Sequence, residues 1–322
     1  MTEVIVDTDI GGDIDDLLTL AMAVRSPEIR LAGVTTVGQQ PKKRASIARA
    51  LLALNGMGHI PVAAGAALPL SGQWRYEEPP NQYGDELAHY GTEAEEDGAD
   101  LMIRLVNAAP GRISVMAIGA MTNVAMAITR SPEFARNVKE IIIMGGEYEA
   151  HYKECNIVSD PEAADVLFRS GIPITAAGLE VCLELACDTD EVIATLKGAN
   201  TEQSRFLAAL VDRWKAVGVN RPIIMFDAIP LAILIDRSFV RTEWKRVQVE
   251  TKGEHTRGMT FSLKPHFGEV QEGVPNVHVC VEVDHKRLMT MFRERVLEET
   301  FAGAGVQAVS AAAPRIFEGG EA

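Results

Sequence analysis

Cysteine, aromatic residues and basic residues are scarce in this chain of 322 residues, and long apolar runs are absent. The four cysteines show no C-x-x-C spacing, and three of them have apolar or acidic neighbours, which favours reduced thiols in a cytoplasmic protein over disulfides. No run reaches 18 apolar residues and no basic, apolar leader follows Met1, so we expect neither a membrane span nor secretion. Lys and Arg total 31 against 45 Asp and Glu, and the net charge of −14 argues against nucleic acid or an anionic membrane as partner. We therefore expect a small-molecule ligand that is neutral, cationic or bridged by a metal ion.

The rest of the composition, 47% hydrophobic and 24% charged, is ordinary for a globular protein. Apolar runs predict buried strands at Val4–Val6, Ile29–Val37 and Ile60–Ala64, with amphipathic helices between them. This alternation predicts an α/β fold with an open, mainly parallel, doubly wound (Rossmann-like) sheet and helices on both faces. Alternating apolar and polar residues after position 246 predict extra antiparallel strands near the C-terminus. No linker or internal repeat is apparent, so we expect residues 1–322 to form a single domain.

The chain is organised around VIVDTDIGGDIDDLLTLAMA, residues 4–23. Its apolar start predicts a strand, its two glycines a turn, and its apolar end the inner face of a helix. Five aspartates therefore crowd one strand end, where each close pair repels by about 1 kcal/mol even in bulk water. A bound cation would offset this repulsion, and an all-oxygen ligand set suits Ca²⁺ or Mg²⁺ rather than zinc. The five residues are Asp7, Asp9, Asp13, Asp15 and Asp16.

Three other interpretations fit part of this stretch. Asp13 or Asp15 could cap the following helix, but capping uses one or two acids rather than five. An EF-hand needs an acid at its twelfth position, which is Leu18 when counted from Asp7. A phosphatase with a nucleophilic strand-end aspartate also begins with Asp-x-Asp after an apolar strand, and this stretch alone does not exclude it.

Later predicted strands also end in small or polar residues. ISVMAI (113–118) runs into Gly119 to Asn123, and EIIIM (140–144) runs into two glycines. In parallel sheets, ligands bind beyond the carboxyl ends of the strands, where these residues fall. The far half of the chain adds Asp227, a lone acid in an apolar run that is either satisfied locally or bound to a ligand.

In chain order, the motifs DTDIGGDIDD, GAMTN, IIIMGG, ECN before SDPEAA, and FDAIPLA resemble those of the inosine-uridine nucleoside hydrolase family. The resemblance continues through VETKGEHTRGMT and PNVHVCVEVD, so it covers nearly the whole chain. It implies a calcium-dependent enzyme that hydrolyses the N-glycosidic bond of ribonucleosides to give ribose and a free base, assembled as a homodimer or homotetramer. The later motifs of the phosphatase class do not appear, so that interpretation fails by comparison.

Residue by residue, the resemblance implies that calcium is bound by Asp9, Asp16, the Thr122 carbonyl and Asp227. Asp9 would also act as general base on a calcium-bound water, and Asp15 would hold the ribose hydroxyls. The substrate-binding residues that it implies are Asp15, Gln40, Met144, Glu154, Asn156 and Phe226.

The sequence departs from the family pattern at three places. Residues 12–14 separate the first glycine from the paired acids where one residue is commonest, so Asp13 is a further candidate ligand. Gln40 stands where many members have an asparagine. Phe226 precedes Asp227 where many members have a histidine that protonates the leaving base, and a phenyl ring can stack on a base but cannot donate a proton.

These departures bear on the choice of substrate. A purine can be protonated on its ring nitrogens, whereas a pyrimidine usually needs a proton from a placed acid. We therefore expect purine nucleosides to be favoured, unless His89, Tyr83 or His151 on a flexible loop supplies the acid. Two alternatives are a catalytically silent binder of nucleosides or ribose, and a hydrolase of another N-ribosyl compound.

Overall fold

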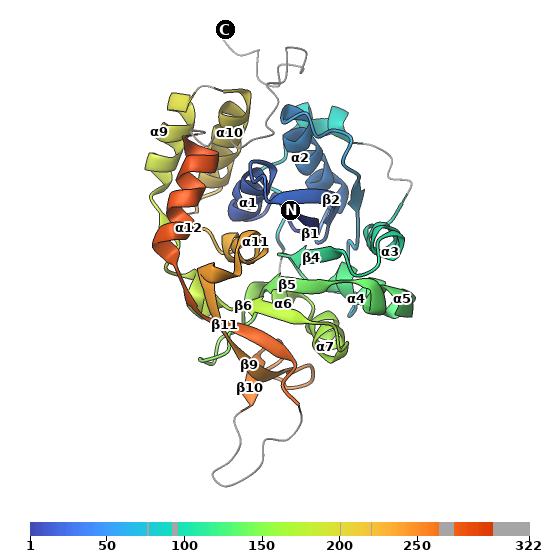
Figure 1. The fold of residues 1–322 in the computed structure, drawn as a ribbon. Coiled ribbons are helices and arrows are strands. Elements are labelled where there is room, and N and C mark those ends of the chain that lie inside the picture. Colours follow the sequence, from blue (N-terminus) through green and yellow to red (C-terminus); the bar gives the residue numbers. More distant parts are fainter. Residues whose placement is uncertain (76, 92–95, 200, 220, 264–273, 299–322) are drawn as a thin grey trace.

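The computed structural model describes residues 1–298 apart from residues 76, 92–95, 200, 220 and 264–273 (Figure 1). Within these ranges, nine strands form one sheet in the order β10-β9-β11-β6-β5-β4-β1-β2-β3. Two further strands, β7 (Ala186–Cys187) and β8 (Ile223–Ile224), pair with each other. The nine strands of the large sheet are β1 (Thr2–Thr8), β2 (Ile29–Thr36), β3 (Val62–Ala64), β4 (Ile113–Ala117), β5 (Glu140–Met144), β6 (Ile174–Ala177), β9 (Val240–Val249), β10 (Thr260–Leu263) and β11 (Val277–Val283).

The pairing of these strands confirms the predicted open α/β sheet. The neighbours from β3 to β11 run parallel, and β9 and β10 extend the sheet by antiparallel pairing. The strand order reverses between β1 and β4, and this is the point at which open parallel sheets bind ligands beyond their carboxyl ends. The acidic stretch follows β1 and therefore lies at this point.

Helices cover both faces of the sheet, as predicted (Figure 1). One apolar cluster joins helices on the first side, and a second cluster joins helices on the other. The first side has α1 (Asp15–Val24), α2 (Pro41–Leu54), α10 (Glu202–Ala216), α11 (Ala228–Ile235) and α12 (His285–Phe292), and the second has α3 (Gly98–Ala108), α4 (Thr122–Arg130), α5 (Pro132–Asn137) and α7 (Pro161–Arg169). The shorter elements and the remaining helix are α6 (Cys155–Ser159), α8 (Leu179–Cys182), α9 (Thr189–Ala199), the 3₁₀ turns η1 (Asp85–Tyr90) and η2 (Arg237–Phe239), and the π turn η3 (Arg293–Leu297).

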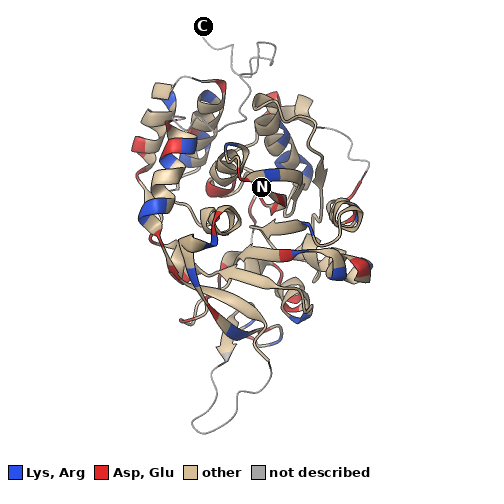
Figure 2. Cartoon of the chain, in the orientation of Figure 1, with Lys and Arg blue, Asp and Glu red and all other residues tan. Residues whose placement is uncertain are grey.

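Charged residues are interspersed over the outer helices, while the central strands are mostly uncharged (Figure 2). Several of the buried acids nevertheless lie at the carboxyl end of β1. In the described part of the chain, none of the helices combines the length and the apolar character that crossing a bilayer requires.

Local sequence signals place many element ends where the pattern predicts them. The helix α7 begins at Pro161, and the Asp160 carboxylate caps it by accepting a hydrogen bond of 3.1 Å from the Ala163 amide. The short helices α5 and α6 are among those that the sequence pattern does not predict. Their caps are the side chains of Ser131 and Glu154, which accept hydrogen bonds from the first turns of these helices. A single capping side chain before a six- or five-residue helix is a weaker signal than a long apolar periodicity.

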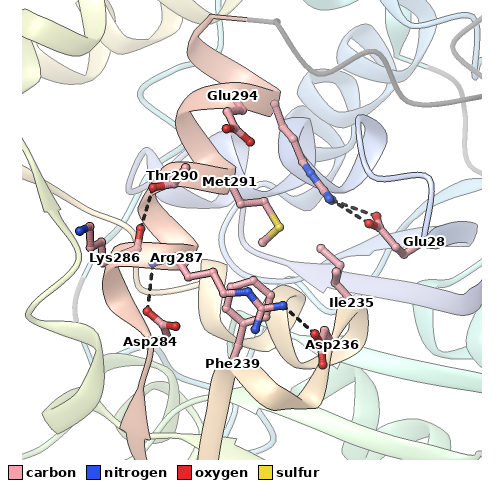
Figure 3. A pocket seen from close by; sticks show the side chains of 11 residues that line it. Glu28, Ile235, Asp236, Phe239, Asp284, Lys286, Arg287, Thr290, Met291 and Glu294 are labelled. Carbon is pink, nitrogen blue, oxygen red and sulfur yellow. Dashed lines mark hydrogen bonds and ion pairs between the residues drawn. The ribbon is translucent and has the colours of Figure 1, made fainter.

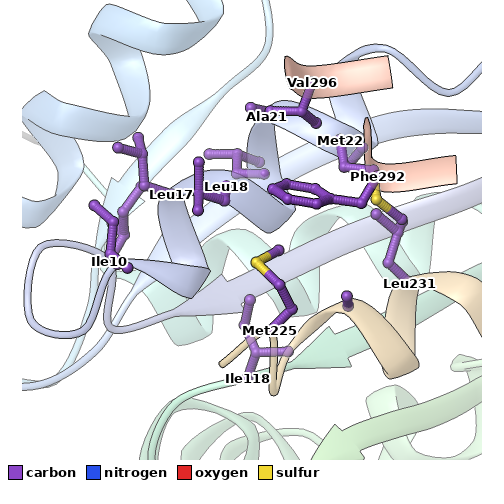
Figure 4. Packing of buried hydrophobic residues seen from close by; sticks show 14 of the residues in the cluster. Ile10, Leu17, Leu18, Ala21, Met22, Ile118, Met225, Leu231, Phe292 and Val296 are labelled. Carbon is purple, nitrogen blue, oxygen red and sulfur yellow. The ribbon is translucent and has the colours of Figure 1, made fainter. Parts of the chain in front are cut away.

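The C-terminal helix closes the core beside the acidic stretch. A helix is predicted over 288–301, and the structure has α12 followed by η3, with residues 299–301 outside the described residues. Phe292 is fully buried and packs in one cluster with Leu18 and Met22 of α1 and with Val296 of η3 (Figure 4). Because α1 carries two aspartates in its first turn, this packing supports the helix that presents them.

Phe292→Ala should lower the free energy of unfolding by about 3–5 kcal/mol, because it deletes a buried aromatic side chain and leaves a cavity. Urea unfolding followed by circular dichroism measures this loss. The control is Lys286→Ala at an exposed position of the same helix, for which we expect a change within about 0.5 kcal/mol. If both variants unfold alike, α12 is not part of the cooperative core.

Candidate active site

Three carboxylates meet at the carboxyl edge of the sheet, where β1 gives way to α1. Asp15 and Asp16 occupy the first turn of α1, and Asp227 directly precedes α11. One carboxylate oxygen from each of the three lies within 4.8 Å of the other two. The fold thus joins two adjacent acids with a third that is 212 positions after Asp15. We call these three residues the carboxylate triad.

Burial makes the triad electrostatically unfavourable when all three groups are charged. Asp15, Asp16 and Asp227 are only 3%, 4% and 3% exposed. Burial is the main cause that raises the pKa of each carboxyl well above its usual value, and the charges of neighbouring aspartates, including Asp9, raise it further. A divalent cation among these oxygens would replace the lost hydration and favour the ionised forms.

Asp9 lies beside the triad, on the turn that follows β1. It is partly exposed, and its carboxyl interacts with that of Asp16. Burial raises the pKa of Asp9, and the positive charge of Arg44 opposes this rise. The Thr8 hydroxyl donates a hydrogen bond to Asp16 and accepts one of 3.0 Å from the Ile10 amide. Asp16 is therefore held in a defined orientation by the end of β1.

Arg44 supplies a buried positive charge next to the acidic turn. It is 1% exposed, and its guanidinium group donates only to backbone carbonyls in the described structure. Buried arginines usually pair with an acid, so this arrangement is uncommon. The guanidinium group thereby connects three segments of the chain. It donates hydrogen bonds to the carbonyl oxygens of Asp9 and Ile10 (the latter at 3.3 Å) after β1, of Gln39 at 2.9 Å before α2, and of Glu78 at 2.5 Å in the irregular segment.

The end of β4 supplies Thr122, the first residue of α4. Its hydroxyl is buried and donates a hydrogen bond of 2.7 Å to the Asp160 carboxylate, which also accepts one of 2.8 Å from the Leu70 amide. The predicted metal contact of Thr122 is through its backbone carbonyl, which this side-chain bond does not involve.

The predicted ribose-binding pair lies beyond β5. Glu154 caps α6, accepting hydrogen bonds of 2.8–3.0 Å from three backbone amides. Burial raises the pKa of Glu154 to about 7, although these three bonds oppose the shift. The Asn156 side chain donates to the carbonyl oxygens of Ile118 and Met144 at 3.1 and 3.0 Å. Because these bonds use its N–H groups, Asn156 has its side-chain oxygen left to accept a hydrogen bond from a ligand.

The turn before α2 places Gln39, rather than Gln40, beside Asp9. Gln40 is exposed, has a φ of 56° and lines a groove with Lys42 and Lys43. Gln39 instead lines a small cavity that Asp9 also lines. The predicted ribose contact of Gln40 therefore finds no support in the position of its side chain.

Phe226, which directly precedes Asp227 of the triad, is linked to Asp13 through Arg221. Phe226 is half-buried, and the Arg221 guanidinium carbon lies 5.9 Å from its ring centroid. Arg221 forms an ion pair with Asp13, the further candidate ligand, which is not part of the triad.

None of the three candidates for a substitute acid is among the described residues that line the cavity beside Asp9. His89 and His151 are exposed, and the His89 ring lies 4.0 Å from that of Tyr90. Tyr83 is half-buried under the Lys43 ammonium, 5.2 Å from its ring centroid.

Residues of the site that the sequence pattern did not identify include Arg44, Trp74 and Glu78. Arg44 shares the buried side of α2 with Ile47, so a lone cation on an apolar helix face was the available signal. Trp74 and Glu78 come from the irregular segment 68–98, which has no periodicity that could single them out.

A second hollow, of about 740 Å³, lies at the other end of α11 from the triad (Figure 3). Its charged groups are largely paired with one another, Arg287 with Asp236 and Arg295 with Glu28. Arg287 also packs over Phe239, at 3.8 Å from the ring centroid. This hollow lacks the convergent buried acids of the triad and is separate from the candidate active site.

The residues beyond β1, β4 and β5 suit a metal ion and a sugar with several hydroxyls. The profile of the inosine-uridine preferring nucleoside hydrolase family matches residues 4–290. The chain belongs to this family. A probable uridine nucleosidase 1 from Oryza sativa subsp. japonica is 32% identical in an alignment of 268 residues that covers 78% of this chain and 82% of that protein. The pyrimidine-specific ribonucleoside hydrolase RihA of Citrobacter koseri is 30% identical over 91% of this chain and 97% of its own.

Solved structures show the same fold. A purine-preferring ribonucleoside hydrolase from Gardnerella vaginalis matches with a TM-score of 0.77 and 27% identity, over 92% of this chain and 98% of that one. The plant nucleoside hydrolase PpNRh1 matches with a TM-score of 0.78 and 26% identity, over 92% and 99%. This nucleoside hydrolase is thus an N-glycosyl hydrolase that cleaves ribonucleosides to ribose and free base. The family is metal-dependent, and the triad is an acidic group that can hold the ion.

Asp7 lies directly behind the site and is fully buried in β1. Its Oδ1 accepts hydrogen bonds of 2.7 Å from the Thr35 hydroxyl and 2.8 Å from the Asn123 side chain, while Oδ2 has no partner in the described ranges. Burial raises the pKa of Asp7 to about 7, and the two hydrogen bonds oppose this rise. The carboxyl therefore binds a proton more tightly in the folded protein than in the unfolded chain.

In metal-free protein, Asp7→Asn should become increasingly stabilising relative to the unaltered protein as the pH rises from 3.8 to about 7. In this window the folded state keeps a proton on Asp7 that the unfolded state releases. The free energy of unfolding of the unaltered protein therefore falls by up to about 1.4 kcal/mol per pH unit because of this group. Asparagine does not titrate. Above the window, the difference in free energy of unfolding between Asp7→Asn and the unaltered protein should therefore stay constant. Urea unfolding with chelator at several pH values measures it. Thr35→Val keeps the titrating carboxyl but removes a bond that lowers its pKa, so the pH dependence should remain and extend to higher pH. A pH-independent effect of Asp7→Asn would contradict the raised pKa.

Proposed function

We propose that this nucleoside hydrolase binds one calcium ion through Asp9, Asp16, Asp227 and the Thr122 carbonyl, and that Asp15 binds the ribose hydroxyls. The observation that carries the proposal is the approach of three buried carboxylate oxygens to within 4.8 Å. Asp9 adjoins this group through Asp16, and Thr122 begins α4, the helix that follows the neighbouring strand β4. The reversal of strand order between β1 and β4, next to which the acidic turn and Thr122 lie in the chain, supports this grouping.

The chemistry of the donors favours calcium over softer metals. Every proposed ligand atom is an oxygen, and neither histidine nor cysteine joins the group among the described residues. Calcium takes six to eight oxygen ligands, which leaves positions for water and for sugar hydroxyls after the protein ligands are counted. Zinc sites instead use nitrogen and sulfur ligands in most proteins.

The proposed reaction adds water across the bond between ribose and base. A bound calcium ion would make a coordinated water more acidic. Asp9 is partly exposed beside the triad, so its carboxylate can accept the proton of the attacking water while the oxygen joins the anomeric carbon. The bond to the base breaks with its electron pair moving to the base nitrogen, which then takes up a proton. The sugar gains positive charge on the way, and the surrounding carboxylates favour that state over the neutral substrate.

We also propose that purine nucleosides are preferred. Phe226 precedes Asp227 and offers a half-buried ring on which a base can stack, but it cannot donate a proton. Family membership does not decide this preference, because the Citrobacter relative is named pyrimidine-specific and the Gardnerella relative purine-preferring.

In a substrate panel, kcat/KM for inosine should exceed that for uridine by about 10²-fold, the lower end of what general acid catalysis contributes. The panel includes p-nitrophenyl riboside, whose leaving group needs no protonation and which should be cleaved faster than either nucleoside. Release of reducing sugar and of nitrophenolate measures the rates. Equal kcat/KM for inosine and uridine would show that an acid is in place.

Asp227→Ala should abolish the stabilisation of the protein by calcium, because it removes the ligand supplied by the far half of the chain. The unaltered protein should gain about 2.7 kcal/mol at a calcium concentration one hundred times the Kd. Thermal unfolding with and without calcium measures the response. Asp236→Ala, at the other end of α11, is the matched control and should keep the response. A normal calcium response in Asp227→Ala would refute its role as ligand.

A further inference from the structure

The irregular segment after β3 is docked on the acidic turn between β1 and α1. The side-chain amides of Asn81 and Gln82 donate hydrogen bonds of 3.3 and 3.2 Å to the Gly12 carbonyl. Gln82 also donates to the carbonyl of Asp13 at 2.6 Å, and its backbone amide donates to that of Gly11 at 3.2 Å. These bonds fix Asn81 and Gln82 against the turn that carries the acids.

Glu78 is held in this segment by its main chain. Its carbonyl accepts a hydrogen bond of 2.5 Å from Arg44, and its amide donates one of 3.3 Å to the Gln39 side chain. Arg44 also donates to the Asp9 carbonyl, so one buried guanidinium fixes Glu78 relative to the proposed general base.

The side chain of Glu78 has neither a hydrogen bond nor an ion pair in the parts of the chain that the structure describes. It is half-buried and packs on Gly12, where an added β-carbon would lie only 2.6 Å from Glu78 Oε1. Glu78 lines the small cavity that Asp9 and Gln39 also line. A carboxylate held in such a place loses hydration without gaining a partner, and a ligand hydroxyl would restore the missing hydrogen bond.

We propose that Glu78 is a further substrate-contacting residue, and that its side chain accepts a hydrogen bond from a hydroxyl of the ribosyl group. This inference rests on the proposed function, in which Asp9 acts at the anomeric carbon. The cavity is lined by Asp9 but not by Phe226, so it belongs to the sugar side of the site rather than to the base side. Sugar hydroxyls are the hydrogen-bond donors that a carboxylate binds there.

The experiment compares Glu78→Ala and Glu78→Gln with Glu77→Ala, an exposed neighbour in the same segment. It measures KM for inosine and for p-nitrophenyl riboside, the inhibition constant of ribose, and the midpoint of calcium titration. Glu78→Ala should raise both KM values and the inhibition constant of ribose by about tenfold, the size expected for one charge-assisted hydrogen bond. Glu78→Gln keeps one acceptor oxygen, so its KM values and ribose inhibition constant should lie between those of Glu78→Ala and the unaltered enzyme. Glu77→Ala should match the unaltered enzyme in all of these constants. The midpoint of calcium titration should be the same in every variant.

Other outcomes overturn the inference in distinguishable ways. A loss for inosine that spares p-nitrophenyl riboside and ribose inhibition would place Glu78 against the base. A shifted calcium midpoint would make it a metal ligand, and unchanged constants in Glu78→Ala would exclude a contact. Each of these results leaves the proposed function standing. Failure of the unaltered enzyme to release ribose from any nucleoside would overturn the proposed function and this inference together.

Discussion

Repulsion among buried carboxylates at the end of β1 is the constraint on which the site depends. Asp15, Asp16 and Asp227 are almost completely removed from water, and Asp9 adds a fourth negative charge. In such surroundings each close pair repels more strongly than in bulk water. The buried cation beside them, Arg44, is engaged with backbone carbonyls and offsets only part of this charge. A divalent cation would offset most of what remains, and the residual negative field would favour the positive charge that glycosidic cleavage places on the sugar.

The fold holds these charges together against their repulsion. The reversal of strand order between β1 and β4 brings the acidic turn next to Thr122, and α11 returns from the far half of the chain to add Asp227. The apolar packing of α12 and η3 on α1 supports the helix that begins with the paired acids. Hydrogen bonds from Thr8 and Arg44 then orient individual groups of the turn.

Much of this architecture could be predicted from the sequence, because long apolar periodicities and strand ends are local signals. The order of strands and helices, the acidic turn after β1 and the Asp160 cap of α7 all follow from residues near in sequence. The position of Gln39 beside Asp9 could not be predicted from the sequence. Gln40, in the turn before α2, has a left-handed backbone conformation, which changes the direction of the chain from that of an extended segment. Glu78 lies in a segment without periodicity, and its position depends on long-range hydrogen bonds, which its carbonyl accepts from Arg44 and its amide donates to Gln39.

The central claim is that this negative charge is balanced by one calcium ion per active site. The most direct measurement is calorimetric titration of chelator-treated enzyme with calcium, combined with inosine hydrolysis assayed on the same samples. We expect a stoichiometry of one ion per chain and activity that rises in proportion to occupancy. Full hydrolytic activity in enzyme that mass spectrometry shows to be free of divalent metal would contradict it.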